Sequence, residues 1–258
     1  DGAESVSALL GFTAPATATV TAGAIWSWRE MAVGINQPSL LRVEDGALVG
    51  FGSNRLTVGG FGLAQPLSSR SATVIATNAS NNPGTLDLGT LLGPVANLII
   101  GETLVGRLEV RDGAKSVAVT TTVGTRDHGT VADGFLTVEG TNASEPARFE
   151  SGSGDQGGLF VAAGAGTDGQ VTVSSGGVMT LTRLSLADGA QSNAVLFVDG
   201  LEAADGGERR STVTAPFPPA VNQAAATSGA TGDCVIGNVG QGTLNVSFGG
   251  LVRCRQIA

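Results

Sequence analysis

Two cysteines, Cys234 and Cys254, carry the most definite chemistry in this sequence, because they are the only cysteines among 258 residues. Two thiols held close together form a disulfide in an oxidising compartment, whereas thiols in a reducing one remain free. A disulfide is expected if the protein is exported. Two reduced thiols buried in the core are the alternative. Which one applies depends on the elements that position the two residues.

Side chains suited to acid–base or nucleophilic catalysis are sparse. The single histidine, His128, lies in the polar segment 125–129, which is typical of an exposed loop rather than of a general base or metal ligand. Asp45 and Asp112 occupy equivalent repeat positions and resemble the carboxylate pair of a glycosidase. About three rungs apart, they are expected at a separation of about 14 Å, beyond the roughly 5–10 Å that glycosidic cleavage requires. The sequence therefore predicts no catalytic residue and no enzyme activity.

Binding sites are suggested by two further groups of residues. Residues 164–168 match half of a calcium-binding nonapeptide, but such sites need consecutive copies. We therefore predict neither a metal nor a cofactor. Trp26 and Trp28 alternate, so they are expected on one side of a strand, where they either cap the core or stack on a sugar. Together with Pro216 and Phe217, they form the candidate contact surface.

The composition excludes several classes of protein. Glycine is abundant at 40 residues, aromatic residues make up only 4%, and tyrosine is absent. The net charge is −8 and Lys115 is the only lysine, so the chain would repel nucleic-acid phosphates. No apolar run approaches the roughly 18 residues of a membrane-spanning helix. Val, Leu, Ile and Thr instead favour pleated strands, with turns supplied by Gly, Asn and Asp.

A long repeat is the strongest pattern. Val43, Val110, Val173 and Val246 mark four aligned segments at intervals of 67, 63 and 73 residues. The shared pattern is apolar-Gly, four residues, Gly or Ser, x, apolar, x, Val, two residues, Gly, then Gly or Ala. Further Leu-x-Val segments lie between these copies, at residues 136–138 for example. Each long repeat is therefore predicted to hold about three strand–turn–strand units of roughly 21 residues each.

One such unit cannot bury its apolar face alone, so the copies must stack on one another. The sequence predicts an all-β fold, a right-handed parallel β-helix (β-solenoid) of about twelve rungs and on the order of 60 Å in length. A β-sandwich would also show short strands, but not an in-register long repeat. Residues 1–258 are expected to form one domain, with 1–18 as an N-terminal segment or cap. Residues 201–233 are expected to be a loop insertion, because prolines interrupt them.

The repeat places both cysteines at predicted core positions. Cys234 aligns with Leu98 and Val161 of other copies, and Cys254 aligns with Ala118 and Leu181. They are separated by 20 residues, about one unit, so we expect them on adjacent rungs. Stacked residues have Cα atoms about 5 Å apart, which suits a disulfide.

The repeat resembles the passenger repeats of autotransporter (type V secretion) proteins and the PEP-CTERM-associated repeats. The matching anchors are Gly34, Gly101 and Gly237, each preceded by two apolar residues, and the Leu-x-Val segment that ends at Val246. This resemblance implies a secreted, right-handed β-helix at a bacterial cell surface. Residues 201–233 depart from the family pattern.

We therefore expect a structural or adhesive protein located extracellularly or at the bacterial cell surface. We expect it to pack end to end or side by side with other copies of itself or with neighbouring surface proteins. It could also assemble into filaments or bind surface polysaccharide. The alternatives are a carbohydrate-active β-helix enzyme and a binding module like a phage tailspike, which would be trimeric.

Overall fold

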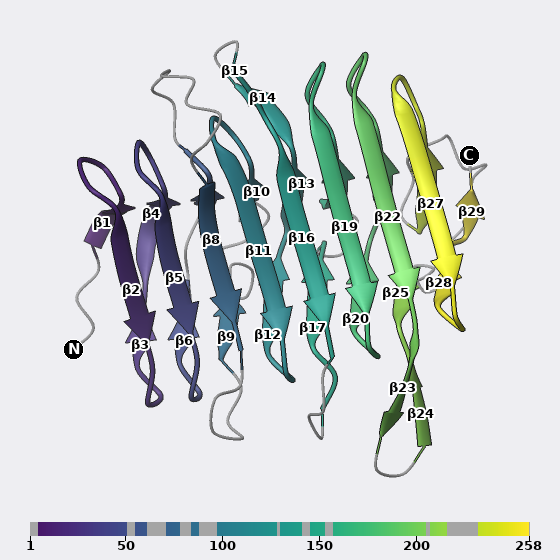
Figure 1. Ribbon diagram of the computed structural model, residues 1–258, viewed down its shortest axis with the longest axis horizontal. Helices are drawn as coiled ribbons and strands as arrows, with labels where there is room; N and C mark the ends of the chain where they lie inside the picture. The colour runs from purple at the N-terminus through teal and green to yellow at the C-terminus, as the bar shows by residue number, and fades with distance from the viewer. Residues whose placement is uncertain are drawn as a thin grey trace, which may run out of the picture.

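The computed structural model describes residues 5–50, 55–60, 71–77, 84–87, 97–127, 130–140, 145–152, 157–204, 207–215 and 232–257. These residues form strands and turns and contain no helix. The strands run parallel in three sheets, which the chain visits in the order A, B, C before returning to A. The strands stack along the long axis of the molecule (Figure 1). The predicted all-β, parallel, solenoid-like fold is thus confirmed, whereas its right-handed coil stays a prediction.

Sheet A has nine strands, in the order β1 (Ser5–Leu10), β4 (Trp28–Val33), β7 (Arg55–Val58), β10 (Asn97–Ile100), β13 (Thr120–Val123), β18 (Gly158–Val161), β21 (Leu184–Leu186), β26 (Asp233–Ile236) and β29 (Gln256–Ile257). Sheet B has eight, in the order β2 (Ala16–Val20), β5 (Ser39–Val43), β8 (Ser71–Ala76), β11 (Val105–Arg111), β16 (Gly134–Glu139), β19 (Asp168–Ser174), β22 (Asn193–Asp199) and β27 (Gln241–Ser247).

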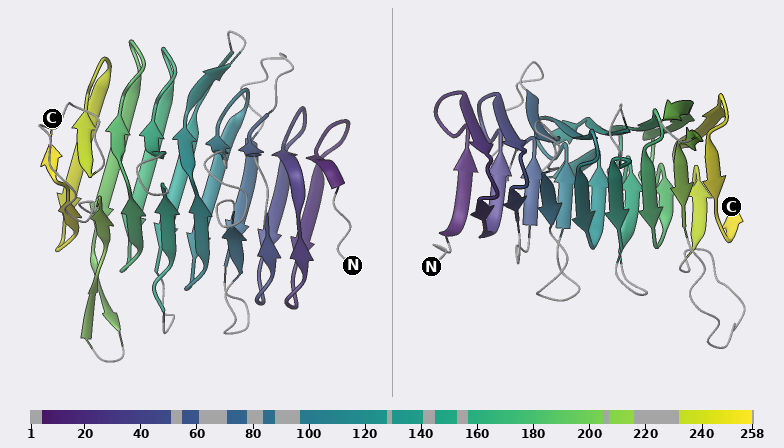
Figure 2. Two further views of the ribbon diagram at one scale, coloured as in Figure 1. Left: turned by 180° about the vertical axis from the view of Figure 1, so that it is seen from behind. Right: turned by 90° about the horizontal axis from the view of Figure 1, so that it is seen from below.

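Sheet C also has eight strands, in the order β3 (Ile25–Trp26), β6 (Leu48–Val49), β9 (Thr85–Asp87), β12 (Lys115–Ala118), β17 (Arg148–Ser151), β20 (Val178–Leu181), β25 (Thr212–Thr214) and β28 (Leu251–Arg253). Within the described ranges, two antiparallel hairpins stand outside the sheets, β14 (Thr125–Asp127) with β15 (Thr130–Ala132), and β23 (Leu201–Ala204) with β24 (Gly207–Arg210). Seen from below, the turns again follow one another along the long axis (Figure 2, right).

The turns of this coil are longer than predicted. The sheets stack eight or nine strands in the described part of the chain, rather than about twelve. Val43 and Val110, one long repeat apart, both pair with Ala76 of β8, so one repeat spans two turns of three strands each. The length of one turn can be read from side-chain hydrogen bonds between neighbouring turns. The two residues of these bonds are separated in sequence by 24, 25, 35 or 48 positions. The expected unit of 21 residues was too short because the corners between strands vary in length.

The Leu-x-Val pattern builds the core as predicted. In sheet B the alternate residues of successive strands pair in register, so that Leu108 lies on Leu136 and Val110 on Val138. These four side chains are buried, whereas the residues between them point outward. Alternation in a strand therefore gives one apolar face, and stacking of the turns covers it.

The predicted glycine corners are present where sheet B passes into sheet C. Asp112 and Gly113 both have positive φ angles, of 53° and 82°. Asp45, Ser175 and Phe248 occupy the same left-handed position before a glycine in other turns. Two consecutive left-handed residues make a tight turn, and Asp and Gly tolerate this conformation.

One aligned copy needs correction at the corner between sheets A and B. The amide of Gly101 donates to the carbonyl of Val58, and the amide of Gly124 donates to that of Ile100. In the third copy the amide of Ala162, with φ of 53°, makes the same bond, to Val123. Ala162 therefore replaces the corner glycine. Gly164, which the repeat pattern aligned there, lies two residues farther along in a longer corner.

The predicted terminal segment and insertion are also revised. Residues 5–18 supply β1 and part of β2, which pair in register with β4 and β5, so they belong to the first turn. Residues 201–233 are not one loop. They begin with the β23–β24 hairpin, which projects below sheet B in Figure 1, and continue with β25, which pairs with β20 and β28 in sheet C.

Candidate functional site

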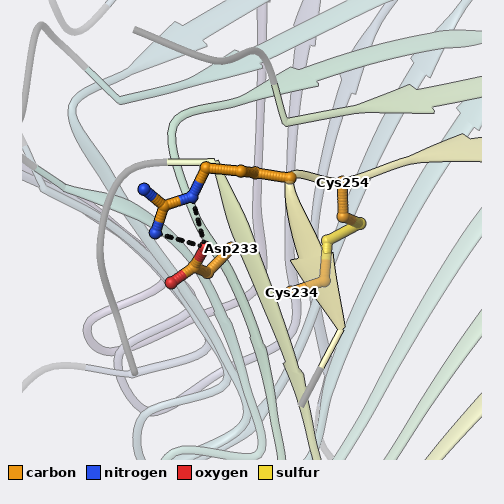
Figure 3. The surroundings of a disulfide bond; sticks show 4 residues. Asp233, Cys234 and Cys254 are labelled. Atoms are coloured by element: carbon orange, nitrogen blue, oxygen red, sulfur yellow. Dashed lines mark hydrogen bonds and ion pairs between the residues drawn. A yellow bond between two sulfur atoms is a disulfide. The ribbon is translucent and has the colours of Figure 1, made fainter. Parts of the chain in front are cut away.

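The predicted disulfide is present. Cys234 lies in β26 of sheet A and Cys254 directly follows β28 of sheet C, and their Cα atoms are 5.9 Å apart. The bond spans the corner at which the last turn returns to sheet A (Figure 3). The expected geometry was wrong, because the cysteines do not lie on top of one another in one sheet. They instead join the beginning and the end of a single turn.

The predicted alignment of Cys234 with other core positions is correct in part. Cys234 pairs with Leu184, and the same column of sheet A contains Leu159 and Leu98, as predicted for Leu98. Val161 lies two residues farther along its strand, where it pairs with Leu186. The repeat pattern therefore placed Cys234 in a core column correctly but matched it with one wrong residue.

A partly buried ion pair lies beside the disulfide. Arg255 follows Cys254 and contacts Asp233, which precedes Cys234, with its Nε donating at 2.9 Å and its terminal nitrogen lying 2.8 Å from the same oxygen (Figure 3). The Asp233 side chain is 3% exposed and the Arg255 side chain 18%. The Arg255 amide also donates to the carbonyl of Gly232, at 2.8 Å. Sequence reasoning missed this pair, although opposite charges next to the two cysteines were a usable signal.

Trp26 and Trp28 lie on different strands. Trp26 ends β3 in sheet C and Trp28 begins β4 in sheet A, so they flank a corner instead of facing one side of a strand. Their ring centroids are 5.3 Å apart, edge to face. Trp28 is buried and its Nε1 donates to the carbonyl of Arg55, whereas Trp26 is half-buried against the core. Trp28 is therefore a core residue and is not available as a contact surface.

Asp45 and Asp112 each form a hydrogen bond to the neighbouring turn. The Thr21 hydroxyl donates to Asp45 at 2.7 Å, and the Thr77 hydroxyl donates to Asp112 at 3.0 Å. The aspartates follow β5 and β11, which are separated by β8 alone, so two strand spacings, or about 10 Å, lie between their corners. This separation is shorter than the predicted 14 Å and lies at the upper limit for paired carboxylates in glycosidases.

The half-match to a calcium repeat makes ordinary turn contacts. Thr167 donates to the carbonyl of Gly164 at 2.8 Å, and Asp168 accepts from the side-chain amide of Asn193. Within the described ranges, no three His, Cys, Asp or Glu residues gather in a way that could hold a metal ion. His128, Pro216 and Phe217 lie outside the described residues.

Exposed large apolar side chains gather at the two ends of the stack. In the described part of the chain, every one of them belongs to the first or the last turn: Leu9, Phe12 and Ile25 in the first, and Val239, Val246, Phe248 and Ile257 in the last. Val246 is 47% exposed, whereas Val198, its partner in the preceding turn, is 0% exposed. Alternation predicts both valines as core residues, and only their place in the stack distinguishes them.

None of the described residues forms a helix that is long and apolar enough to cross a membrane. No protein-family model, curated protein or solved structure matches this chain.

Proposed function

We propose that the protein is a structural or adhesive β-solenoid of the bacterial surface or the extracellular space, and that copies of it assemble end to end. The observation that carries this proposal is the concentration of exposed large apolar residues in the first and last turns. Among the described residues between these two turns, no large apolar side chain is exposed. The residues that repeat build the core and the corners, which is typical of a scaffold.

The first and the last described turns both present exposed apolar side chains and a strand edge. β2 and β27 each pair with one strand only in the described part of sheet B, so each presents a row of backbone groups along one edge. Such an edge accepts another strand. A first turn placed on a last turn would continue the parallel ladder and cover Val246 and Phe248 with apolar side chains. The coil is inferred to be right-handed, as almost all parallel crossover connections are.

The location is inferred from two features. The Cys234–Cys254 disulfide is compatible with an oxidising compartment. The apolar-Gly and Leu-x-Val anchors resemble autotransporter and PEP-CTERM-associated repeats, which implies secretion. Recovery of the protein from the cell surface or the medium supports this assignment, and recovery from the cytoplasm contradicts it.

End-to-end assembly is tested by electron microscopy and sedimentation of the 258-residue protein. Wild-type protein is expected to form rods longer than one molecule. Phe248→Asn should shorten them, because it removes an 81% exposed apolar side chain while Asn tolerates the left-handed backbone at this corner. Thr172→Asn, on the outward side of β19 in mid-stack, is the matched control and should not change rod length. Monomeric wild-type rods, or rods unaffected by Phe248→Asn, contradict the proposal.

A carbohydrate-active enzyme is the second candidate, because Asp45 and Asp112 lie closer together than the sequence suggests. Their test is turnover of a panel of acidic and neutral polysaccharides by wild-type protein and by Asp45→Asn and Asp112→Asn variants. Turnover that both substitutions abolish supports the enzyme. Binding without turnover favours the adhesive function. A stable trimer in light scattering points instead to a module like a tailspike.

A further inference from the structure

We propose that the Cys234–Cys254 disulfide is a reducible clasp for the last turn, residues 232–257. When a thiol or dithiol reductant opens it, this turn detaches while the preceding turns stay folded. The inference rests on the geometry of the last turn and does not depend on end-to-end assembly. It concerns the two cysteines, the ion pair beside them and the strands between them.

The first argument is the path of the chain. Between the two cysteines it passes through the end of β26, the whole of β27 and the whole of β28. The disulfide therefore closes one complete turn into a covalent ring. It does not attach that turn to the preceding one. Strand pairing with β21, β22 and β25 makes that attachment, together with side-chain hydrogen bonds from Asn238 to Asp188 and from Ser247 to Asp199.

The second argument is the weak packing of the last turn. In β27, Leu244 is half-buried and Val246 is exposed. Their partners in β22, Leu196 and Val198, are fully buried. In the described structure β27 and β28 have a neighbouring strand on one side only. Among the described strands, β27 and β28 therefore pack against a neighbouring turn on one side, whereas inner strands pack on both, and a region with fewer buried contacts opens more easily.

The third argument is the ion pair. Arg255 and Asp233 connect the same two segments as the disulfide, one residue away from each cysteine (Figure 3). The pair supports the same closure as the disulfide. The Arg255 side chain is nevertheless partly exposed, and such a pair contributes less than a covalent bond. The ion pair alone is therefore expected not to keep the turn closed.

The chemistry of the opening step is ordinary thiol–disulfide exchange. The Sγ–Sγ bond breaks, each cysteine sulfur gains a proton, and the two electrons come from the reductant, whose own thiols become a disulfide. Cys234 is fully buried and Cys254 is half-buried, so the reductant reaches the bond at Cys254. Detachment uncovers the edge of β22 together with Leu196 and Val198. An edge exposed in this way can pair with another strand.

Hydrogen exchange with and without dithiothreitol tests the clasp. The amides of Gln241 and Leu251 donate to the carbonyls of Ser192 and Ser211 in the preceding turn, so they report detachment. After reduction their exchange should accelerate on the order of 100-fold, the effect expected when a closed loop of about 20 residues is released. The amides of Arg148 and Val178, which join inner turns, should exchange at an unchanged rate.

Three variants make the result decisive. Cys254→Ser should show the accelerated exchange without reductant, and the Cys234→Ser/Cys254→Ser variant should not respond to dithiothreitol at all. Arg255→Gln, which keeps the disulfide, should accelerate exchange less than Cys254→Ser does. If thiol titration finds two free thiols and the amides of the last turn are still protected, the proposal is overturned. Faster exchange throughout the solenoid, or failure of Cys254→Ser to fold, also overturns it, because both mean that the inner turns depend on the bond.

Discussion

Ser151 of β17 and Thr121 of β13 meet inside the core, where their hydroxyl oxygens are 2.9 Å apart. Ser151 Oγ also lies 2.9 Å from the carbonyl oxygen of Gly158. Because a hydroxyl carries one proton, Ser151 donates to Gly158 while it accepts from Thr121. The two residues belong to sheets C and A, so this contact fixes the corner at which the chain returns from one sheet to the other.

Removal of one hydroxyl from this pair should be costly. Ser151→Ala leaves the buried Thr121 hydroxyl and the Gly158 carbonyl without their hydrogen bonds to Ser151. The free energy of unfolding is therefore expected to fall by about 1–3 kcal/mol. The measurement is the midpoint of urea unfolding. Adding Thr121→Val, which removes the stranded hydroxyl, should recover part of the loss. If the double variant is as unstable as the two single losses combined, the hydroxyls do not interact.

Ser116 presents the opposite case. It is fully buried in β12, beside Phe149, and its Oγ has no hydrogen-bond partner in the described part of the molecule. Ser116→Ala should therefore leave the stability unchanged or raise it by about 1 kcal/mol, because no hydrogen bond is lost. Phe149→Ala, at the paired position, should cost about 3–5 kcal/mol through the cavity it leaves. Marked destabilisation by Ser116→Ala would show that the hydroxyl has a partner.

The corner glycines provide a matched comparison. Gly101 has φ of 80°, and a Cβ there would lie 2.3 Å from the carbonyl oxygen of Asp133. Gly23 has φ of 70° with nothing within 4 Å of such a Cβ. Gly23→Ala should cost about 1–2 kcal/mol for its left-handed backbone alone. Gly101→Ala should cost about 1–3 kcal/mol more, because the backbones must separate. Equal thermal melting temperatures for the two variants would contradict this distinction.

Position along the stack should determine the cost of losing a core leucine. Leu136 and Leu244 occupy the same column of sheet B, but Leu136 is 1% exposed and Leu244 lies half-buried in the last described turn. Leu136→Ala is expected to cost about 2–5 kcal/mol, and Leu244→Ala clearly less. Calorimetry on both variants tests the difference. A larger effect at Leu244 would mean that the last turn is packed as tightly as the inner ones.

The sequence could predict the parallel fold, the core columns and the disulfide, because each depends on a local pattern that stacking repeats. Val43, Val110, Val173 and Val246 do occupy one column, although two turns separate each from the next. The number of turns was missed because short strands such as β3 and β6 have no alternation long enough to recognise. The contact between Asp233 and Arg255, 22 positions apart, was missed because the opposite charges beside the two cysteines were not read together with the predicted disulfide.

The two hairpins show that the pairing register of the sheets does not depend on the length of the connections between strands. β22 and β25 keep their pairing in sheets B and C although the β23–β24 hairpin stands between them, and β13 and β16 do the same around β14–β15. Extra chain at a corner therefore leaves the stacked strands undisturbed. This molecule is accordingly suited to the display of foreign peptides, with the β23–β24 hairpin as a graft site whose cargo would point away from the rod.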